Sequence, residues 1–141
     1  MILERYVVDA SVAAKWYFHE EHSERADGLL ERDCEILAPG LLVVEIATLV
    51  WKRARRGEIT EAAADRIVVA LREVPLEIRP TAELVTAALP LALHRGLTLY
   101  DSVYAALAVK SGCPLVTADR KLYDVLRGSN LADHALWIGE L

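Results

Sequence analysis

Short apolar runs recur along the whole chain, and polar segments separate them. Each run holds three or four residues dominated by aliphatic or aromatic side chains, which is typical of strands buried on both faces of a sheet. Pro114 directly precedes one run, a position that a strand start tolerates. The five predicted strands cover residues 6–8, 35–38, 76–78, 115–117 and 135–138.

The segments between these runs carry apolar residues at helical spacing. Thr60 is placed to cap one helix, and Gly57 and Gly112 are placed to end two others. Pro90 lies inside one pattern and predicts that this helix is kinked or split there. The predicted helices cover residues 12–18, 22–32, 41–56, 61–73, 81–95, 101–111 and 120–126.

Strands that alternate with helices predict an α/β fold in which helices cover both faces of a parallel sheet. We therefore expect a three-layer α/β/α sandwich with a five-stranded parallel sheet. The 141 residues are a typical length for one domain, so we expect a single domain over residues 1–141. Ligands of such folds bind outside the carboxyl ends of the strands.

Composition narrows the class of protein. With 54% hydrophobic residues and one Phe, we expect an aliphatic core in which three tryptophans, Trp16, Trp51 and Trp137, are large isolated fillers. The formal net charge of −5 argues against tight, unspecific binding of nucleic acid by the whole surface, but it allows a local basic patch.

Cysteine usage and hydropathy predict a cytoplasmic location. Cys34 and Cys113 lie far apart, which favours two small buried residues in a reducing compartment. Glu4 and Arg5 leave no room for a signal peptide. The longest apolar stretch, residues 36–51, is too short to span a membrane.

Four acids lie in or beside apolar runs, where a folding chain tolerates charge least. Asp9 and Asp119 follow the first and fourth predicted strands, while Glu45 and Asp101 lie on predicted helices that are mostly apolar. No Lys or Arg lies inside these runs. Because buried carboxylates need a partner or a cation, the pattern favours a shared metal site.

Each acid also has an ordinary structural explanation. Asp9 and Asp119 could cap the helices that follow them, and Asp101 could favour its helix dipole from the first turn. Glu45 could pair with an Arg from elsewhere. The joint pattern favours metal, since oxygen ligands select Mg²⁺ or Mn²⁺ and such a site hydrolyses phosphodiesters. The four His residues show no ligand spacing.

Four stretches resemble the PIN-domain family, and within it the VapC-type toxin ribonucleases. The resemblance covers essentially the whole chain and is carried by residues 7–11, 44–47, 99–108 and 115–119. It implies a PIN-like five-stranded sheet and a Mg²⁺- or Mn²⁺-dependent endoribonuclease that cuts single-stranded regions of RNA. It further implies the toxin of a VapBC-type toxin–antitoxin pair.

The resemblance also implies roles for individual residues and for partners. Asp9 and Asp101 match the direct metal ligands, and Glu45 and Asp119 match the supporting acids. Two hydroxyl residues, Ser11 and Thr117, match positions that orient the carboxylates. Relatives of this type pair as homodimers, and a small VapB-like antitoxin blocks them by inserting a basic or aromatic side chain. The helices at 41–56 and 61–73 would form the clamp for both contacts.

A basic run, Lys52-Arg53-Ala54-Arg55-Arg56, ends the helix at 41–56. It could simply complement the helix dipole, or Arg53 and Arg55 could contact RNA phosphates. No aromatic stacking platform is evident, although Trp16 and Tyr17 are candidates if they are not core residues. Three further cations adjoin the predicted site strands, namely Lys15, Arg120 and Lys121.

Two other classes of protein compete with a nuclease. A phosphatase of the haloacid-dehalogenase type needs a second acid where Ser11 stands, and a receiver-like phosphate acceptor needs an acid where Arg79 and Pro80 stand. A binding module on the same fold, acting mainly through an antitoxin-like protein with little turnover, stays open. Metal-dependent cleavage that depends on Asp9 separates this module from an enzyme.

Overall fold

A computed structural model describes residues 3–141, and its strands form one parallel sheet with the order β3-β2-β1-β4-β5. The predicted five-stranded parallel sheet is confirmed. Each strand agrees with its predicted run to within two residues at either end. The strands are β1 (Glu4–Val8), β2 (Cys34–Pro39), β3 (Leu76–Arg79), β4 (Leu115–Thr117) and β5 (Ala135–Trp137).

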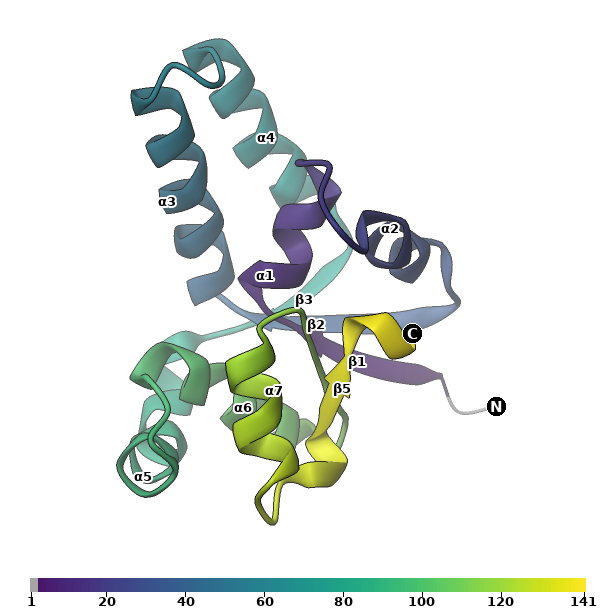
Figure 1. The fold of residues 1–141 in the computed structure, drawn as a ribbon, viewed down its shortest axis with the longest axis vertical. Helices are drawn as coiled ribbons and strands as arrows, with labels where there is room; N and C mark the ends of the chain where they lie inside the picture. The colour runs from purple at the N-terminus through teal and green to yellow at the C-terminus, as the bar shows by residue number, and fades with distance from the viewer. Residues whose placement is uncertain (1–2) are drawn as a thin grey trace.

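Helices cover both faces of this sheet, which confirms the three-layer arrangement. Helices α1 to α4 lie on one side of the sheet, and α5 to α7 lie on the other (Figure 1). Short 3₁₀ helices follow α1 and β5 and precede α5 and β5. The α-helices are α1 (Ala10–Ala13), α2 (Ser23–Glu31), α3 (Leu41–Arg55), α4 (Glu61–Glu73), α5 (Val85–Arg95), α6 (Leu99–Ser111) and α7 (Arg120–Arg127).

Local signals in the sequence explain where several helices begin and end. The Thr60 hydroxyl accepts a hydrogen bond from the Ala63 N–H at 3.0 Å, and so caps α4 as predicted. Gly57 and Gly112 follow α3 and α6 with φ values of 73° and 65°, a left-handed conformation that glycine adopts without strain. Both predicted stops are therefore confirmed.

The predicted helix 81–95 breaks elsewhere than at Pro90. A 3₁₀ helix, Thr81–Leu84, precedes α5, and α5 then continues through Pro90. Proline cannot donate to the carbonyl four residues earlier, which belongs to Thr86. Thr86 and Pro90 are both exposed, so water can satisfy the freed carbonyl. Exposure on the outer face explains why this proline does not divide the helix.

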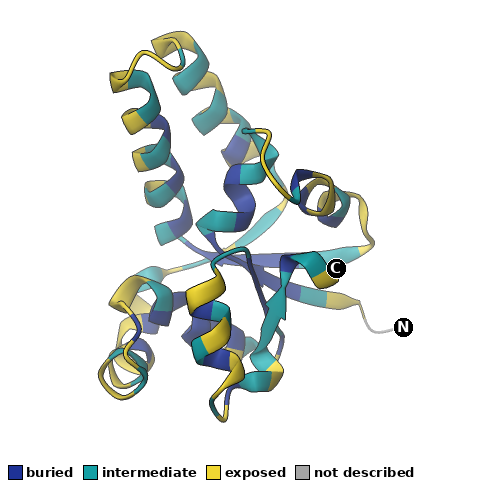
Figure 2. Ribbon diagram, viewed as in Figure 1, coloured by how far each residue is buried: buried dark blue, intermediate teal, exposed yellow. Residues whose placement is uncertain are grey.

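The core is aliphatic as predicted, but the prediction that all three tryptophans fill it fails for Trp51. Residues 6–8 of β1, all of β4 and residues 102–108 of α6 are buried (Figure 2). Trp51 instead leaves 53% of its surface exposed on α3, and Trp16 and Trp137 are only partly buried. Trp16 and Trp137 still pack against the edge of the core.

The strand order reverses between β1 and β4, and this reversal positions the acids. The chain moves from β1 outward to β2 and β3, and then returns to place β4 on the other side of β1. Val7 pairs with Leu115 and Val8 with Val116, so the residues that follow both strands emerge side by side. This is the crevice in which open α/β sheets bind ligands. Among residues 3–141, no helix has the length and apolarity needed to cross a membrane.

Candidate active site

Asp9 lies directly after β1 at this crevice, and its carboxylate is buried with only 5% exposed. One oxygen, Oδ1, accepts hydrogen bonds from the Ser11 hydroxyl at 2.5 Å and the Val12 N–H at 3.2 Å. The other, Oδ2, accepts one from the Thr117 hydroxyl at 2.5 Å. These donors compensate part of the lost hydration and fix the orientation of the carboxylate.

Ser11 and Thr117 also connect Asp9 to the loop that follows β4. The Ser11 hydroxyl oxygen accepts from the Ala118 N–H at 2.9 Å, and the Thr117 hydroxyl oxygen accepts from the Asp119 N–H at 3.0 Å. Each hydroxyl therefore accepts from the β4 loop and donates its proton to Asp9. The orienting role that the resemblance implies for these residues agrees with this geometry.

Asp9 and Asp119, which follow β1 and β4, both cap the helices that begin after them. The Asp119 Oδ1 atom accepts from the Leu122 N–H at 3.2 Å and caps α7, as Asp9 caps α1. Asp119 is partly exposed, however, whereas Asp9 is buried. A cap needs no burial, so capping alone does not explain why the chain encloses Asp9.

Glu45 reaches the site from α3, one turn from the start of the helix, and is partly buried. Its Oε1 atom accepts a hydrogen bond of 2.5 Å from the Tyr104 hydroxyl on α6. Within residues 3–141, Glu45 forms no ion pair with Lys or Arg, so the alternative of an Arg partner is not found.

Tyr104 is a site residue that the sequence analysis missed. It lies three residues after Asp101 on α6, so both side chains leave the same helical face. Within the buried residues 102–108 of α6 it is the one residue that combines a large ring with a polar group. A buried polar ring one helical turn from a predicted metal ligand is the sequence feature that could have identified Tyr104.

Asp101 occupies the first turn of α6, and its charge interacts with those of the other three acids. Its backbone N–H donates to the Thr98 hydroxyl at 3.0 Å, so Thr98 and not Asp101 is the cap. Its charge contributes to raising the pKa values of Asp9 and Glu45, and Asp119 in turn contributes to raising the pKa of Asp101. Asp101 therefore lies near enough to each of the other three acids for their charges to interact.

Burial dominates the electrostatics of the site. It raises the pKa of Asp9 to about 6, against the opposing effect of the Ser11, Thr117 and Val12 hydrogen bonds. Burial likewise raises the pKa values of Glu45 and Asp101. In residues 3–141 none of the four acids forms an ion pair. The charge of Lys121 lowers the pKa of Asp101, but it does not outweigh the effect of burial. The cluster is therefore short of positive charge.

The four acids suit a hard divalent cation by their chemistry, although they are not yet arranged as ligands. Within residues 3–141, no three His, Cys, Asp or Glu side chains lie close enough together to hold a metal ion as they stand. Carboxylate oxygens are nevertheless the donors that Mg²⁺ and Mn²⁺ prefer. A cation would also relieve the mutual repulsion that adds to burial in raising these pKa values.

Most of the basic and aromatic residues considered for RNA contact already make contacts within the protein. The Arg53 guanidinium lies 4.0 Å from the centre of the Phe18 ring, and that of Arg55 lies 4.8 Å from the centre of the Trp51 ring. Trp16 and Tyr17 pack against the core. Two of the further cations already have partners: Lys15 pairs with Glu20 at 3.3 Å, and Arg120 pairs with Asp124 at 3.5 Å.

The raised pKa of Asp9 predicts how stability depends on pH. An acid whose pKa is higher in the folded state stabilises the fold when protonated, and this contribution is lost as pH rises from about 4 through about 6. In chelator, the stability of wild type should therefore fall relative to Asp9→Asn by up to about 3 kcal/mol between pH 4 and pH 8. Urea unfolding at both pH values measures the difference. Asp124→Asn, on an exposed pair, is the control, and a flat difference for Asp9→Asn would contradict the assignment.

Comparison with known proteins places the chain in a family. The model of the PIN domain family matches residues 6–127. Ribonuclease VapC3 of Pyrobaculum aerophilum is 40% identical over 120 residues, which cover 84% of this chain and 92% of that protein. Exonuclease VapC9 of the same organism is 35% identical over 133 residues, covering 88% and 87% of the two chains.

Solved structures share the fold. The crystal structure of PAE2754 from Pyrobaculum aerophilum superimposes with a TM-score of 0.69 at 28% identity, over 97% of this chain and 85% of that one. A toxin-antitoxin complex from Klebsiella pneumoniae gives a TM-score of 0.68 at 14% identity, over 96% and 99%. With the matched family model and the two VapC relatives, these findings show that the chain belongs to the PIN domain family.

Proposed function

We propose that this protein is a divalent-metal-dependent endoribonuclease that cuts single-stranded regions of RNA. We further propose that residues 1–141 form a single PIN domain, the toxin of a VapBC-type pair. The observation that carries the proposal is the enclosed Asp9 carboxylate, held by two hydroxyls and lying with three further acids that have no ion-paired cation. Such a cluster destabilises the fold unless it serves a cation.

In this proposal each acid has a role that follows from its place. Asp9 and Asp101 bind Mg²⁺ or Mn²⁺ directly, and Glu45 and Asp119 complete the site, directly or through water. Ser11 and Thr117 keep both Asp9 oxygens in one orientation. When bound, the cation supplies neutralisation of phosphate charge and activation of the attacking water. A hydrolysis of this kind requires no nucleophilic Ser or Cys.

The names of the relatives support a nuclease but do not decide whether it cuts within a strand or from an end. VapC3 is named a ribonuclease and VapC9 an exonuclease. The binding module with little turnover shares the same fold and predicts no cleavage. A substrate without ends separates an endonuclease from an exonuclease, and a metal-dependence test separates either from the binding module.

We expect the purified protein to cut a circular single-stranded RNA in Mg²⁺ or Mn²⁺ but not in chelator. Asp101→Asn should lower the rate by at least about 100-fold, because it removes a direct ligand. Gel analysis of linearised product measures both. Asp133→Asn, an exposed acid away from the four, is the matched control. Cutting of linear RNA alone would favour an exonuclease, and no cutting of either would favour the binding module.

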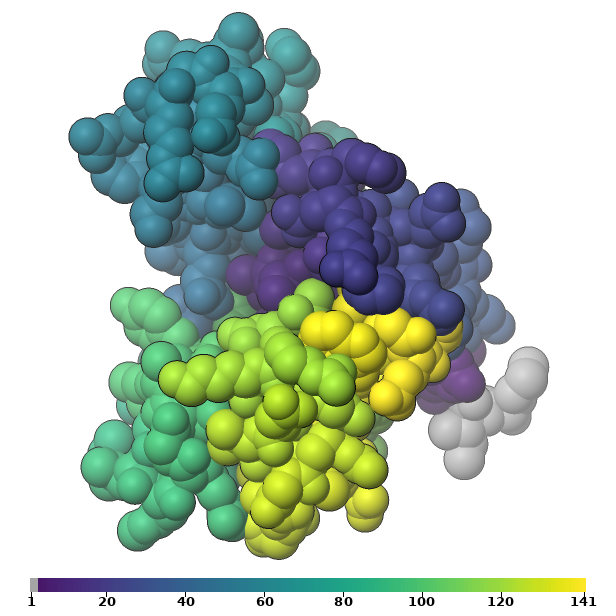
Figure 3. All heavy atoms as spheres, viewed as in Figure 1, coloured from purple at the N-terminus to yellow at the C-terminus, as the bar shows by residue number. Residues whose placement is uncertain are grey.

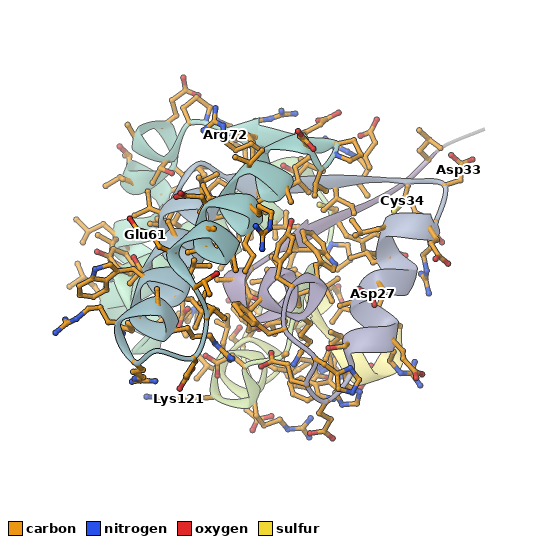
Figure 4. All side chains as sticks on the ribbon, turned by 90° about the horizontal axis from the view of Figure 1, so that it is seen from above. Asp27, Asp33, Cys34, Glu61, Arg72 and Lys121 are labelled. Carbon is orange, nitrogen blue, oxygen red and sulfur yellow. The ribbon has the colours of Figure 1, made fainter. Side chains whose placement is uncertain are left out.

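We propose that Arg53 and Arg55 contact RNA phosphates. Both lie about two to three turns beyond Glu45 on α3, roughly 12 and 15 Å along the axis at about 1.5 Å a residue. Seen along the long axis, Lys121 and Glu61 of α4 project to one side and Asp27 of α2 to the other (Figure 4), although α7 lies below the sheet and the start of α4 lies far above it (Figure 1). In this proposal an RNA strand that runs from Asp101 toward the end of α3 meets Arg53 and Arg55 along its path.

Removing both charges in Arg53→Ala/Arg55→Ala should weaken RNA binding and lower the slope of log K against log salt by about 1.4, as expected for two phosphates of a single strand. Fluorescence anisotropy at several salt concentrations measures the slope. The control is Lys110→Ala/Arg127→Ala, which removes the same charge from the far ends of α6 and α7. An equal loss in both double variants would indicate a general charge effect and no specific contact.

We propose that an antitoxin-like protein binds the pair of helices α3 and α4, which projects from the body of the molecule (Figure 3). A hollow of about 440 Å³ opens between the two helices. Its apolar lining includes the exposed Trp51, and Arg55, Glu61 and Asp65 stand at it as charged residues. An apolar groove with charges beside it suits an amphipathic helix. The toxin-antitoxin complex from Klebsiella pneumoniae shares the fold.

We propose that the protein pairs as a homodimer through α5, and not through the clamp of α3 and α4 that the resemblance implies for this contact. Val85, Leu89 and Leu93 recur every four residues on this helix and are exposed, Leu93 by 72%. A row of this kind is unfavourable in water, and a second copy can bury it by symmetric packing.

Leu89→Glu/Leu93→Glu should convert the dimer into a monomer, because burying two carboxylates in an apolar contact is unfavourable. Size-exclusion chromatography with light scattering measures the mass. Val69→Glu changes an equally exposed residue on α4 and should leave the dimer intact. A dimer that persists in the α5 variant would place the contact elsewhere.

A further inference from the structure

Tyr104 connects two layers of the fold at the acid site. It is 1% exposed, lies on α6 below the sheet, and donates a 2.5 Å hydrogen bond to Glu45 on α3 above it. The two residues are 59 positions apart in sequence. Few other contacts connect the projecting helix α3 to α6, so this bond ties the Glu45 carboxylate to the body of the protein (Figure 1).

Packing alone does not explain the hydroxyl. A Phe ring would fill the same space, and a buried hydroxyl without a partner is unfavourable. A phenol keeps its proton at neutral pH, so the Tyr104 hydroxyl donates to the Glu45 carboxylate.

A glutamate on a helix has three rotatable bonds, and Glu45 is only partly buried. Without a fixed donor, its carboxylate can turn away from the mutually repelling acids into water. The hydrogen bond occupies Oε1 and leaves Oε2 free to face the cluster. Tyr104 thus relates to Glu45 as Ser11 and Thr117 relate to Asp9.

We propose that Tyr104 is a positioning residue that holds Glu45 ready to bind the divalent cation. This inference rests on the proposed function, because it assigns a role to Glu45 in the metal site. It makes Tyr104 part of the machinery without contact to substrate or metal. It also assigns a purpose to the one polar aromatic residue within the buried part of α6.

The variant Tyr104→Phe tests the inference by Mn²⁺ affinity in the absence of RNA. Isothermal titration should show about tenfold weaker Mn²⁺ binding, the lower end of what loss of a supporting hydrogen bond causes. In RNA cleavage kcat should fall while KM for RNA changes little. Tyr6→Phe is the matched control, because it removes another phenol–carboxylate bond, of 2.8 Å to Glu4, from the other end of β1.

A double-variant cycle asks whether Tyr104 acts through Glu45. Tyr104→Phe should weaken Mn²⁺ binding in wild type and have no further effect in Glu45→Gln. Equal Mn²⁺ affinity of folded Tyr104→Phe and wild type would overturn the inference. If Tyr104→Phe does not fold, Glu45→Asp withdraws the carboxylate from both the hydroxyl and the metal site. Unchanged Mn²⁺ affinity in this variant would still refute the inference.

Failure of the proposed function gives a different pattern. If wild type binds no Mn²⁺, or if Asp101→Asn binds it as tightly as wild type, the metal site itself is refuted and this inference with it. If Asp101→Asn loses binding and Tyr104→Phe does not, the metal site stands and only the role of Tyr104 is refuted.

Discussion

The structure depends on the enclosure of one carboxylate, that of Asp9, at the point where the strand order reverses. A charge in this place is unfavourable unless donors or cations surround it. The chain supplies two hydroxyls, from Ser11 after β1 and from Thr117 at the end of β4. Each of these hydroxyls is in turn held by a backbone N–H of the β4 loop. The orientation of Asp9 therefore depends on the pairing of β1 with β4, because that pairing brings Thr117 and the β4 loop beside it.

The topology explains why four acids distant in sequence meet. Asp9 and Asp119 follow adjacent parallel strands, so they emerge at the same edge of the sheet. Glu45 arrives from a helix on one face and Asp101 from a helix on the other, and each lies within about one turn of the start of its helix. All these helices begin at the carboxyl ends of strands or beside them. The parallel α/β arrangement thus brings two acids from the sheet and one from each helical layer to the same edge of the sheet.

The sequence predicted the fold and the positions of the acids well, because both follow from local patterns. Short apolar runs and caps such as Thr60 are strong signals that packing rarely overrides. The sequence did not predict that α5 continues through Pro90, since this depends on the exposure of that helical face. Nor did it predict the exposed Trp51, because a count of aromatic residues says nothing about which face of its helix each one occupies. The Tyr104–Glu45 bond was missed because it joins residues whose proximity only the packed layers create.

The surface of α3 and α4 proposed to bind an antitoxin-like protein lies close to the acid Glu45, which Tyr104 of α6 contacts. Glu45 lies on the same helix as the groove residue Trp51, and its neighbour Val44 lines a second hollow with Leu71 of α4. A protein that grips α3 and α4 therefore acts within one or two turns of a site acid. Because the Tyr104 hydroxyl fixes that acid from the opposite layer, a small movement of α3 changes the length of this one bond. If an antitoxin-like protein binds here as proposed, displacing Glu45 from its donor would disturb the proposed metal site without any contact to the other three acids.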